Sequence, residues 1–219
     1  AQGFLLEKPQ PLEDLAPAER GSYQSEEMWW KFARLRAEAP VHFTKDSADG
    51  FGDYWSVTKW DDIVRIDTDS VTFSNEAGIT IAANRHDSQP SEIAPDGSQQ
   101  TPLTHMMRKA NQDVEIGGQL IKQGEKIALW YISGNRDETA IDRPNEFIVD
   151  RKNPRKHISF GFGIHRCLGN RLAELQLRLT WEEILTRFPE IKEVGEPVRG
   201  YNNFAKGYDR MSLPCSTCF

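Results

Sequence analysis

Ten residues, Phe160-Gly161-Phe162-Gly163-Ile164-His165-Arg166-Cys167-Leu168-Gly169, carry the strongest signal in this sequence of 219 residues. They place one cysteine in a glycine-rich loop directly before a long amphipathic segment. A helix that begins there presents unpaired N–H groups and partial positive charge to the sulfur, which favours the thiolate, the metal-binding form of cysteine. Because glycine has no Cβ, Gly161, Gly163 and Gly169 let the backbone approach a flat ligand closely. The pattern predicts a metal-bound thiolate at Cys167.

The same ten residues resemble the cysteine-ligand loop of the cytochromes P450, the haem-thiolate monooxygenases. The family pattern is Phe, two residues, Gly, one residue, a basic residue, one residue, Cys, one residue and Gly. The matching positions are Phe160, Gly163, His165, Cys167 and Gly169. The alternative is a structural cysteine at a helix start beside an unrelated glycine-rich loop, and the length of the match favours the family.

The resemblance implies haem b as the cofactor, with Cys167 as the axial metal ligand and catalytic residue, since a thiolate donates electron density to iron and favours O–O cleavage. His165 and Arg108 match positions that pair with haem propionates; the alternatives are a surface-loop histidine and a solvated strand arginine. Phe160 is expected to shield the sulfur, or simply to be core. The expected cofactor-binding residues are Arg108, Phe160, Gly161, His165, Cys167 and Gly169.

The resemblance covers both ends of the chain but not the middle of the family's fold. Residues 1–81 correspond to an N-terminal helix and strand part, and residues 101–219 to hairpins, the ligand loop and the helix after it. Residues 82–100 are polar, show no period of 2 or 3.6, and read as a flexible connector in place of the central helices. The expected fold class is mainly α with small β hairpins (α+β), a cytochrome P450 fold that is internally truncated.

Several stretches are most similar to the bacterial terminal alkane and fatty-acid hydroxylases of this superfamily, among them 50–58, 130–137 and 170–178. The resemblance therefore implies a monooxygenase that hydroxylates the terminal carbon of an alkane or fatty acid with O₂. The sequence has no dinucleotide fingerprint and no cysteine cluster for an iron–sulfur centre, so we expect ferredoxin and ferredoxin reductase to supply the electrons.

Two alternatives stay open. One is a non-catalytic haem-binding remnant, because the sequence lacks the family's central helix with its acid–alcohol pair. The family's Glu-x-x-Arg motif is matched only at Glu196 to Arg199, which contains Pro197 and follows the cysteine, so we interpret that match as accidental. The other alternative is that the full polypeptide carries the missing middle.

Composition narrows the class of protein. The chain is 38% hydrophobic and 27% charged, as in globular proteins, and its formal net charge of -6 argues against nucleic acid as a partner. No apolar run approaches the roughly 20 residues of a membrane span, and Ala1 to Lys8 does not resemble a signal peptide. We expect a cytoplasmic protein. Three cysteines do not suggest a disulfide framework.

The hydrophobic pattern of the N-terminal part predicts an irregular lead-in over residues 7–25, a helix over 26–39, and strands at 41–43 and 54–57. Thr58 followed by Asp61 predicts the start of a helix whose apolar face holds Trp60, Ile63, Val64 and Ile66. In the C-terminal part we expect strands at 103–110 and 126–132, a hairpin at Gly117-Gly118, irregular structure over 135–151, a helix to Arg187 and a last hairpin over 201–213.

Three further features of the sequence give weaker predictions. Arg151, Lys152, Arg155 and Lys156, with Arg166 and Arg171, form a basic group that would attract an acidic redox partner, or is only a solvated loop. Cys215 and Cys218 form a C-x-x-C pair, for which terminal disorder is the alternative to metal or redox chemistry. The apolar faces of the helices at 26–39 and 170–187 expect neighbours that the missing middle would supply, which predicts reduced stability or association.

Overall fold

The computed structural model describes residues 10–45, 49–76, 78–81, 103–188, 191 and 194–212. The helices are η1 (Leu12–Asp14), α1 (Arg20–Gln24), α2 (Met28–Glu38), α3 (Trp60–Thr68), α4 (Tyr131–Gly134), η2 (Gly163–His165) and α5 (Asn170–Arg187), where η marks a 3₁₀ turn. The strands are β1 (Val41–Thr44), β2 (Tyr54–Val57), β3 (Phe73–Ser74), β4 (Met106–Ala110), β5 (Val114–Ile116), β6 (Gln119–Ile121), β7 (Lys126–Leu129), β8 (Val198–Arg199) and β9 (Tyr208–Arg210). This mixture of helices and small sheets is the α+β class that the sequence predicted.

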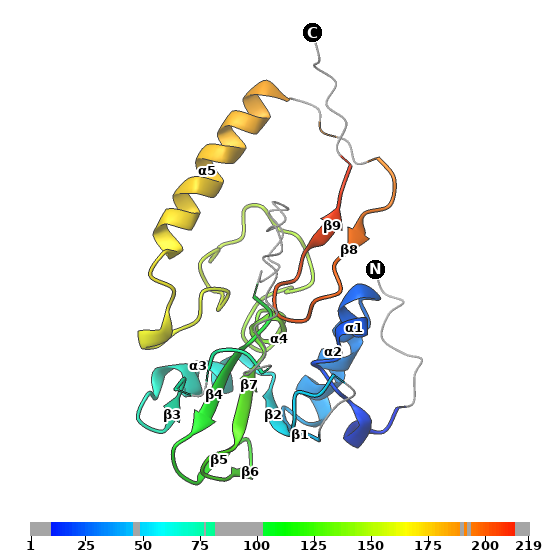
Figure 1. The fold of residues 1–219 in the computed structure, drawn as a ribbon. Helices are drawn as coiled ribbons and strands as arrows, with labels where there is room; N and C mark the ends of the chain where they lie inside the picture. The colour runs from blue at the N-terminus through cyan, green and yellow to red at the C-terminus, as the bar shows by residue number, and fades with distance from the viewer. Residues whose placement is uncertain are drawn as a thin grey trace.

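The main sheet joins the two ends of the chain (Figure 1). Its strand order is β1-β2-β7-β4-β3, so β7 and β4 from the C-terminal part lie between strands of the N-terminal part. β2 and β7 run parallel with Val57 opposite Leu129, and β4 pairs antiparallel to β7 with Arg108 opposite Ile127. The predicted connector at 82–100 lies outside the described residues.

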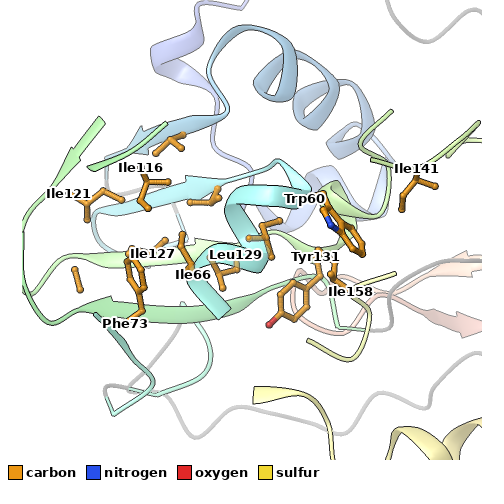
Figure 2. Packing of buried hydrophobic residues seen from close by; sticks show 14 residues of the cluster. Trp60, Ile66, Phe73, Ile116, Ile121, Ile127, Leu129, Tyr131, Ile141 and Ile158 are labelled. Atoms are coloured by element: carbon orange, nitrogen blue, oxygen red, sulfur yellow. The ribbon is translucent and has the colours of Figure 1, made fainter. Parts of the chain in front are cut away.

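The larger apolar cluster lies between α3 and the main sheet (Figure 2). Ile63 and Ile66 of α3 pack with Phe73, Ile127 and Leu129, and all five are buried. Tyr131 lies at the edge of the cluster, with its hydroxyl group directed away from the other labelled side chains. α3 is therefore held firmly against the sheet, which fixes the position of its C-terminal end.

A second cluster buries α2. Met28, Phe32 and Leu35 are fully buried, and the ring centroids of Phe32 and Trp130 are 5.2 Å apart. The expectation that the helix at 26–39 lacks neighbours is therefore wrong, because Trp130 and Ile132 beyond β7 fill its apolar face.

α5 is different. None of its 18 residues is buried, and it stands apart from the sheet and from α2 in Figure 1. Leu172, Leu175 and Leu179 along it are exposed, as is Leu168 just before it. For this helix the expectation of missing neighbours is confirmed within the described residues.

Several predicted boundaries were wrong. Residues 20–24 of the expected lead-in form α1, and the last ladder pairs β8 with β9, so its first strand precedes residue 201. The strand expected at 126–132 ends at Leu129, because the chain turns at Trp130 into α4, whose Ser133 and Gly134 N–H groups donate to the Trp130 carbonyl.

The start of α3 is where the sequence predicted it, but the capping is different. The hydroxyl group of Thr58 donates to the carbonyl of Pro40, while the N–H of Trp60 donates to Asp137 from a distant loop. The predicted hairpin at Gly117-Gly118 is confirmed: both glycines have positive φ (55° and 76°), as a type I′ turn requires.

Candidate cofactor site

The cysteine loop is closed by its own backbone. The Cys167 N–H donates to the carbonyl of Phe160 over 2.8 Å, and the Gly161 N–H donates to that of Ile158 over 2.9 Å. The Cys167 side chain is exposed and free of any disulfide, and α5 begins three residues later at Asn170. The predicted arrangement, a thiol in a tight loop immediately before a long helix, is confirmed.

A buried carboxylate that the sequence analysis missed lies behind this loop. Asp67, in the last turn of α3, accepts hydrogen bonds from Arg108 Nη2 at 2.7 Å, from the Tyr131 hydroxyl group at 2.7 Å and from the Phe162 N–H at 3.0 Å. Its position gives a signal that could have found it. Trp60, Ile63 and Asp67 follow the helical repeat, so the carboxylate continues the buried stripe of α3.

Arg108 is not a solvated strand arginine. Its side chain is 3% exposed and forms an ion pair with Asp67, which is 0% exposed, while its Nη1 donates to the carbonyl of Met107. Two of the three guanidinium nitrogens therefore donate hydrogen bonds. The third, Nε, is buried and has no hydrogen-bond partner among the described residues.

His165 in η2 offers a second buried nitrogen without a partner among the described residues, its Nε2. Burial lowers the pKa of this imidazole, and the positive charge of Arg108 lowers it further, whereas Asp67 raises it. Arg108 and His165 thus lie within electrostatic reach of each other. Two orphaned nitrogens near one loop fit an acceptor that carries negative charge, such as a carboxylate group.

The glycines of the loop allow close packing against α3. Gly163 has a φ of 58°, and a Cβ there would lie 3.0 Å from the carbonyl oxygen of Asp67 and 3.1 Å from Thr68. Gly161 has a φ of 70°, and a Cβ there would lie 3.2 Å from the Tyr131 hydroxyl group. These glycines are needed for contact with the protein itself, in addition to the predicted approach to a flat ligand.

The remaining predicted residues lie in the same loop. The Phe160 ring contacts His157 at a centroid distance of 5.8 Å, and a Cβ on Gly169 would lie 3.8 Å from the Cys167 sulfur. The structure therefore brings Phe160, Gly161, His165 and Gly169 into the Cys167 loop. It places Arg108 behind that loop through Asp67.

Several of the basic residues next to the loop form hydrogen bonds or ion pairs within the chain. The Arg151 guanidinium group donates to the carbonyls of Asp142, Arg143 and Glu146. Arg155 and Arg171 both form ion pairs with Glu174, at 3.3 and 3.1 Å. Lys152 and Lys156 are exposed. The pair Cys215 and Cys218 lies outside the described residues.

Comparison with known proteins agrees with this geometry. Residues 99–203, which hold Arg108 and the whole cysteine loop, match the family model for cytochrome P450. This part of the chain is similar to the cytochrome P450 family. Members of the family bind haem, and the thiol and the two orphaned nitrogens found here are the donors that haem iron and haem carboxylates require.

Individual cytochromes P450 show how far the similarity extends. The chain is 42% identical over 113 residues to linalool 8-monooxygenase of Pseudomonas putida, and 40% identical over 116 residues to steroid C26-monooxygenase of Mycolicibacterium smegmatis. Each match covers 52% of this chain and 28% of the relative. The chain thus spans less than a third of the length of these curated relatives.

A solved structure gives a match over most of the chain. Cytochrome P450-153 from Novosphingobium aromaticivorans aligns with a TM-score of 0.77 and 28% identity, covering 90% of this chain and 98% of that one. Among the described residues, no helix has the length and apolar character needed to cross a bilayer.

Proposed function

We propose that Cys167 binds the iron of haem b as a thiolate, and that the protein to which this chain belongs is a haem-thiolate monooxygenase. The observation that carries this proposal is the convergence of three features on one loop: an exposed thiol, the buried Nε of Arg108 and the buried Nε2 of His165. The thiol suits the iron, and the two nitrogens suit the haem propionates.

Each residue has a defined part in this proposal. Cys167 is the metal ligand, while Arg108 and His165 would hold the propionates and thereby orient the macrocycle. Phe160, Gly161 and Gly169 would shape the loop around the sulfur. When bound, the haem would supply the chemistry that activates O₂. The overall reaction would insert one oxygen atom into a C–H bond to give an alcohol and release the other as water, with two electrons and two protons consumed.

We propose an aliphatic substrate, an alkane or fatty acid hydroxylated at its terminal carbon. The resemblance of residues 50–58, 130–137 and 170–178 to terminal hydroxylases supports it. The names of two relatives, which specify linalool and steroids, point to other apolar substrates of the family. Turnover of an n-alkane, a fatty acid and linalool under identical conditions tests the proposal. Terminal alcohol from the first two supports it, whereas product from linalool alone contradicts it.

We propose a ferredoxin as the electron donor, attracted by the basic residues beside the loop. The double variant Arg155→Glu and Lys156→Glu should slow reduction by ferredoxin, and added salt should slow reduction of the wild-type protein. Lys122→Glu is the control, because Lys122 lies on an exposed turn after β6 and pairs with Asp113 rather than with a residue of the loop. A reduction rate that the double variant leaves unchanged, and that salt does not affect in the wild type, would remove the ferredoxin proposal.

A second candidate is a haem-binding remnant without catalysis. The exposed apolar residues of α5 favour it, since the helix next to the ligand loop buries none of its residues. Water that reaches the reacting centre would promote side reactions in place of hydroxylation. Haem titration followed by turnover separates the two candidates. Haem uptake with product favours the monooxygenase, and haem uptake without product favours the remnant.

A further inference from the structure

We propose that Asp67 is the positioning residue of the cysteine loop. Its carboxylate holds the Phe162 N–H, the Arg108 guanidinium group and the Tyr131 hydroxyl group in one arrangement. It thereby orients Arg108 Nε and His165 Nε2, which have no hydrogen-bond partner among the described residues. The part of this inference that concerns haem rests on the proposed function. The part that concerns the loop rests on the geometry of Asp67 alone.

The three donors come from three separate parts of the chain. Arg108 lies on β4, Tyr131 begins α4, and Phe162 belongs to the loop itself, five residues before Cys167. Oδ1 of Asp67 accepts from Arg108, and Oδ2 accepts from Tyr131 and Phe162. An ionised carboxylate can accept about four hydrogen bonds. A counter-ion for Arg108 would need only the first of these contacts, so the bond to the loop backbone indicates a further role.

The main chain at Asp67 contacts the loop as well. A Cβ on Gly163 would lie 3.0 Å from the Asp67 carbonyl oxygen, which means that the loop rests directly on the end of α3. The larger apolar cluster fixes α3 through Ile63 and Ile66, both fully buried. Asp67 therefore connects a rigid part of the fold to the segment that carries the thiol.

The hydrogen bond to Asp67 also determines which nitrogen of Arg108 is left for a ligand. Nη2 is held by Asp67 and Nη1 by the carbonyl of Met107, which leaves Nε as the buried nitrogen without a partner among the described residues. An asparagine in place of Asp67 would keep one acceptor oxygen and present an NH₂ group to donors. The Arg108 guanidinium group and the Phe162 N–H could then not both be satisfied.

Hydrogen exchange of the haem-free chain tests the loop part directly. In the wild type, the Phe162 amide should exchange at least about tenfold more slowly than exposed loop amides, the ratio expected for one hydrogen bond to a charged group. Asp67→Asn should remove that protection. Ile63→Val is the matched control, because it weakens packing of the same helix without touching the carboxylate. A Phe162 amide that is unprotected in the wild type overturns the inference without any variant.

The spectrum of the haem-loaded protein tests the second part. Asp67→Asn should weaken haem binding by about tenfold or more and lower the fraction of reduced, carbon-monoxide-bound protein that shows the red-shifted thiolate band. Ile63→Val should leave that fraction unchanged even where its melting temperature falls as far. Equal fractions in both variants overturn the positioning role. If the wild type takes up no haem, the proposed function fails, and the exchange measurement still decides whether Asp67 holds the loop.

Discussion

Nη2 of Arg108 lies 2.7 Å from Oδ1 of Asp67, and both side chains are buried. Asp67 comes from α3 in the N-terminal part of the chain and Arg108 from β4 beyond the 82–100 segment. Breaking a buried pair leaves one charge without compensation, which is far more costly than losing an exposed pair. The ion pair therefore joins the two parts of the chain directly behind the cysteine loop.

Replacing Arg108 tests the cost of breaking this pair. Arg108→Met should lower the free energy of unfolding by about 3–5 kcal/mol, because Asp67 is then buried and unpaired. Lys122→Met is the control: its pair with Asp113 is more than half exposed on both sides, so the expected loss is about 0–1 kcal/mol. Urea denaturation measures both. Equal losses in the two variants would contradict the buried-pair account.

Replacing Gly163 and Gly118 by alanine distinguishes the cost of backbone strain from the cost of steric crowding. Gly163→Ala should destabilise the fold by more than Gly118→Ala, because both glycines have positive φ but only Gly163 is crowded, by Asp67 and Thr68. The shared cost of the left-handed conformation is about 1–2 kcal/mol. Thermal melts of the two variants give the comparison. A Gly163→Ala variant no less stable than Gly118→Ala would show that the loop does not rest on α3.

His105 should make the fold sensitive to acid. Burial lowers its pKa from 6.5 to about 3, and its ring packs 4.6 Å from the centroid of Trp130. The unfolded chain takes up a proton below pH 6.5 while the folded chain does not. The free energy of unfolding therefore falls as the pH drops from 6.5 towards 3, by up to about 1.4 kcal/mol per pH unit.

His105→Phe keeps an aromatic ring beside Trp130 and removes the titration. We expect the variant to lose less stability than the wild type over this acid range, as measured by urea denaturation at a series of pH values. If the free energy of unfolding falls equally with decreasing pH in the two proteins, His105 is not the group responsible.

α5 should be the least protected helix among those described. It buries no residue, and most of the stability of a helix in a protein comes from tertiary packing. Amides within α5 should exchange much faster than those of β7 and α3. A lipid or a dye that binds exposed apolar surface should bind the exposed leucines of α5. Strong protection along α5 in a monomer would show that the helix is covered.

The sequence predicted much of the fold because local rules decide it. The helical repeat of Trp60, Ile63 and Ile66 marked α3, and Gly117-Gly118 marked the hairpin, since both signals are contained within a few residues. The covering of α2 by Trp130 depends on a contact with Phe32, about 100 positions away, which no local pattern records.

The same distinction holds for the site. The cysteine loop was predicted because its glycines and its cysteine lie within ten residues. The resemblance supplied Arg108 and His165 as a pair, and the structure brings them within electrostatic reach of each other. Asp67 was missed because its importance comes from three donors in distant segments, although its place on the buried stripe of α3 was visible.

The most direct test of the haem-thiolate assignment is the absorption spectrum of the reduced, carbon-monoxide-bound protein. The chain is loaded with haem and compared with its Cys167→Ser variant, which removes the sulfur and little else. We expect a strongly red-shifted Soret band in the wild type and its loss in the variant. A variant that takes up haem with an unaltered spectrum, or a wild type that takes up no haem, would contradict the assignment.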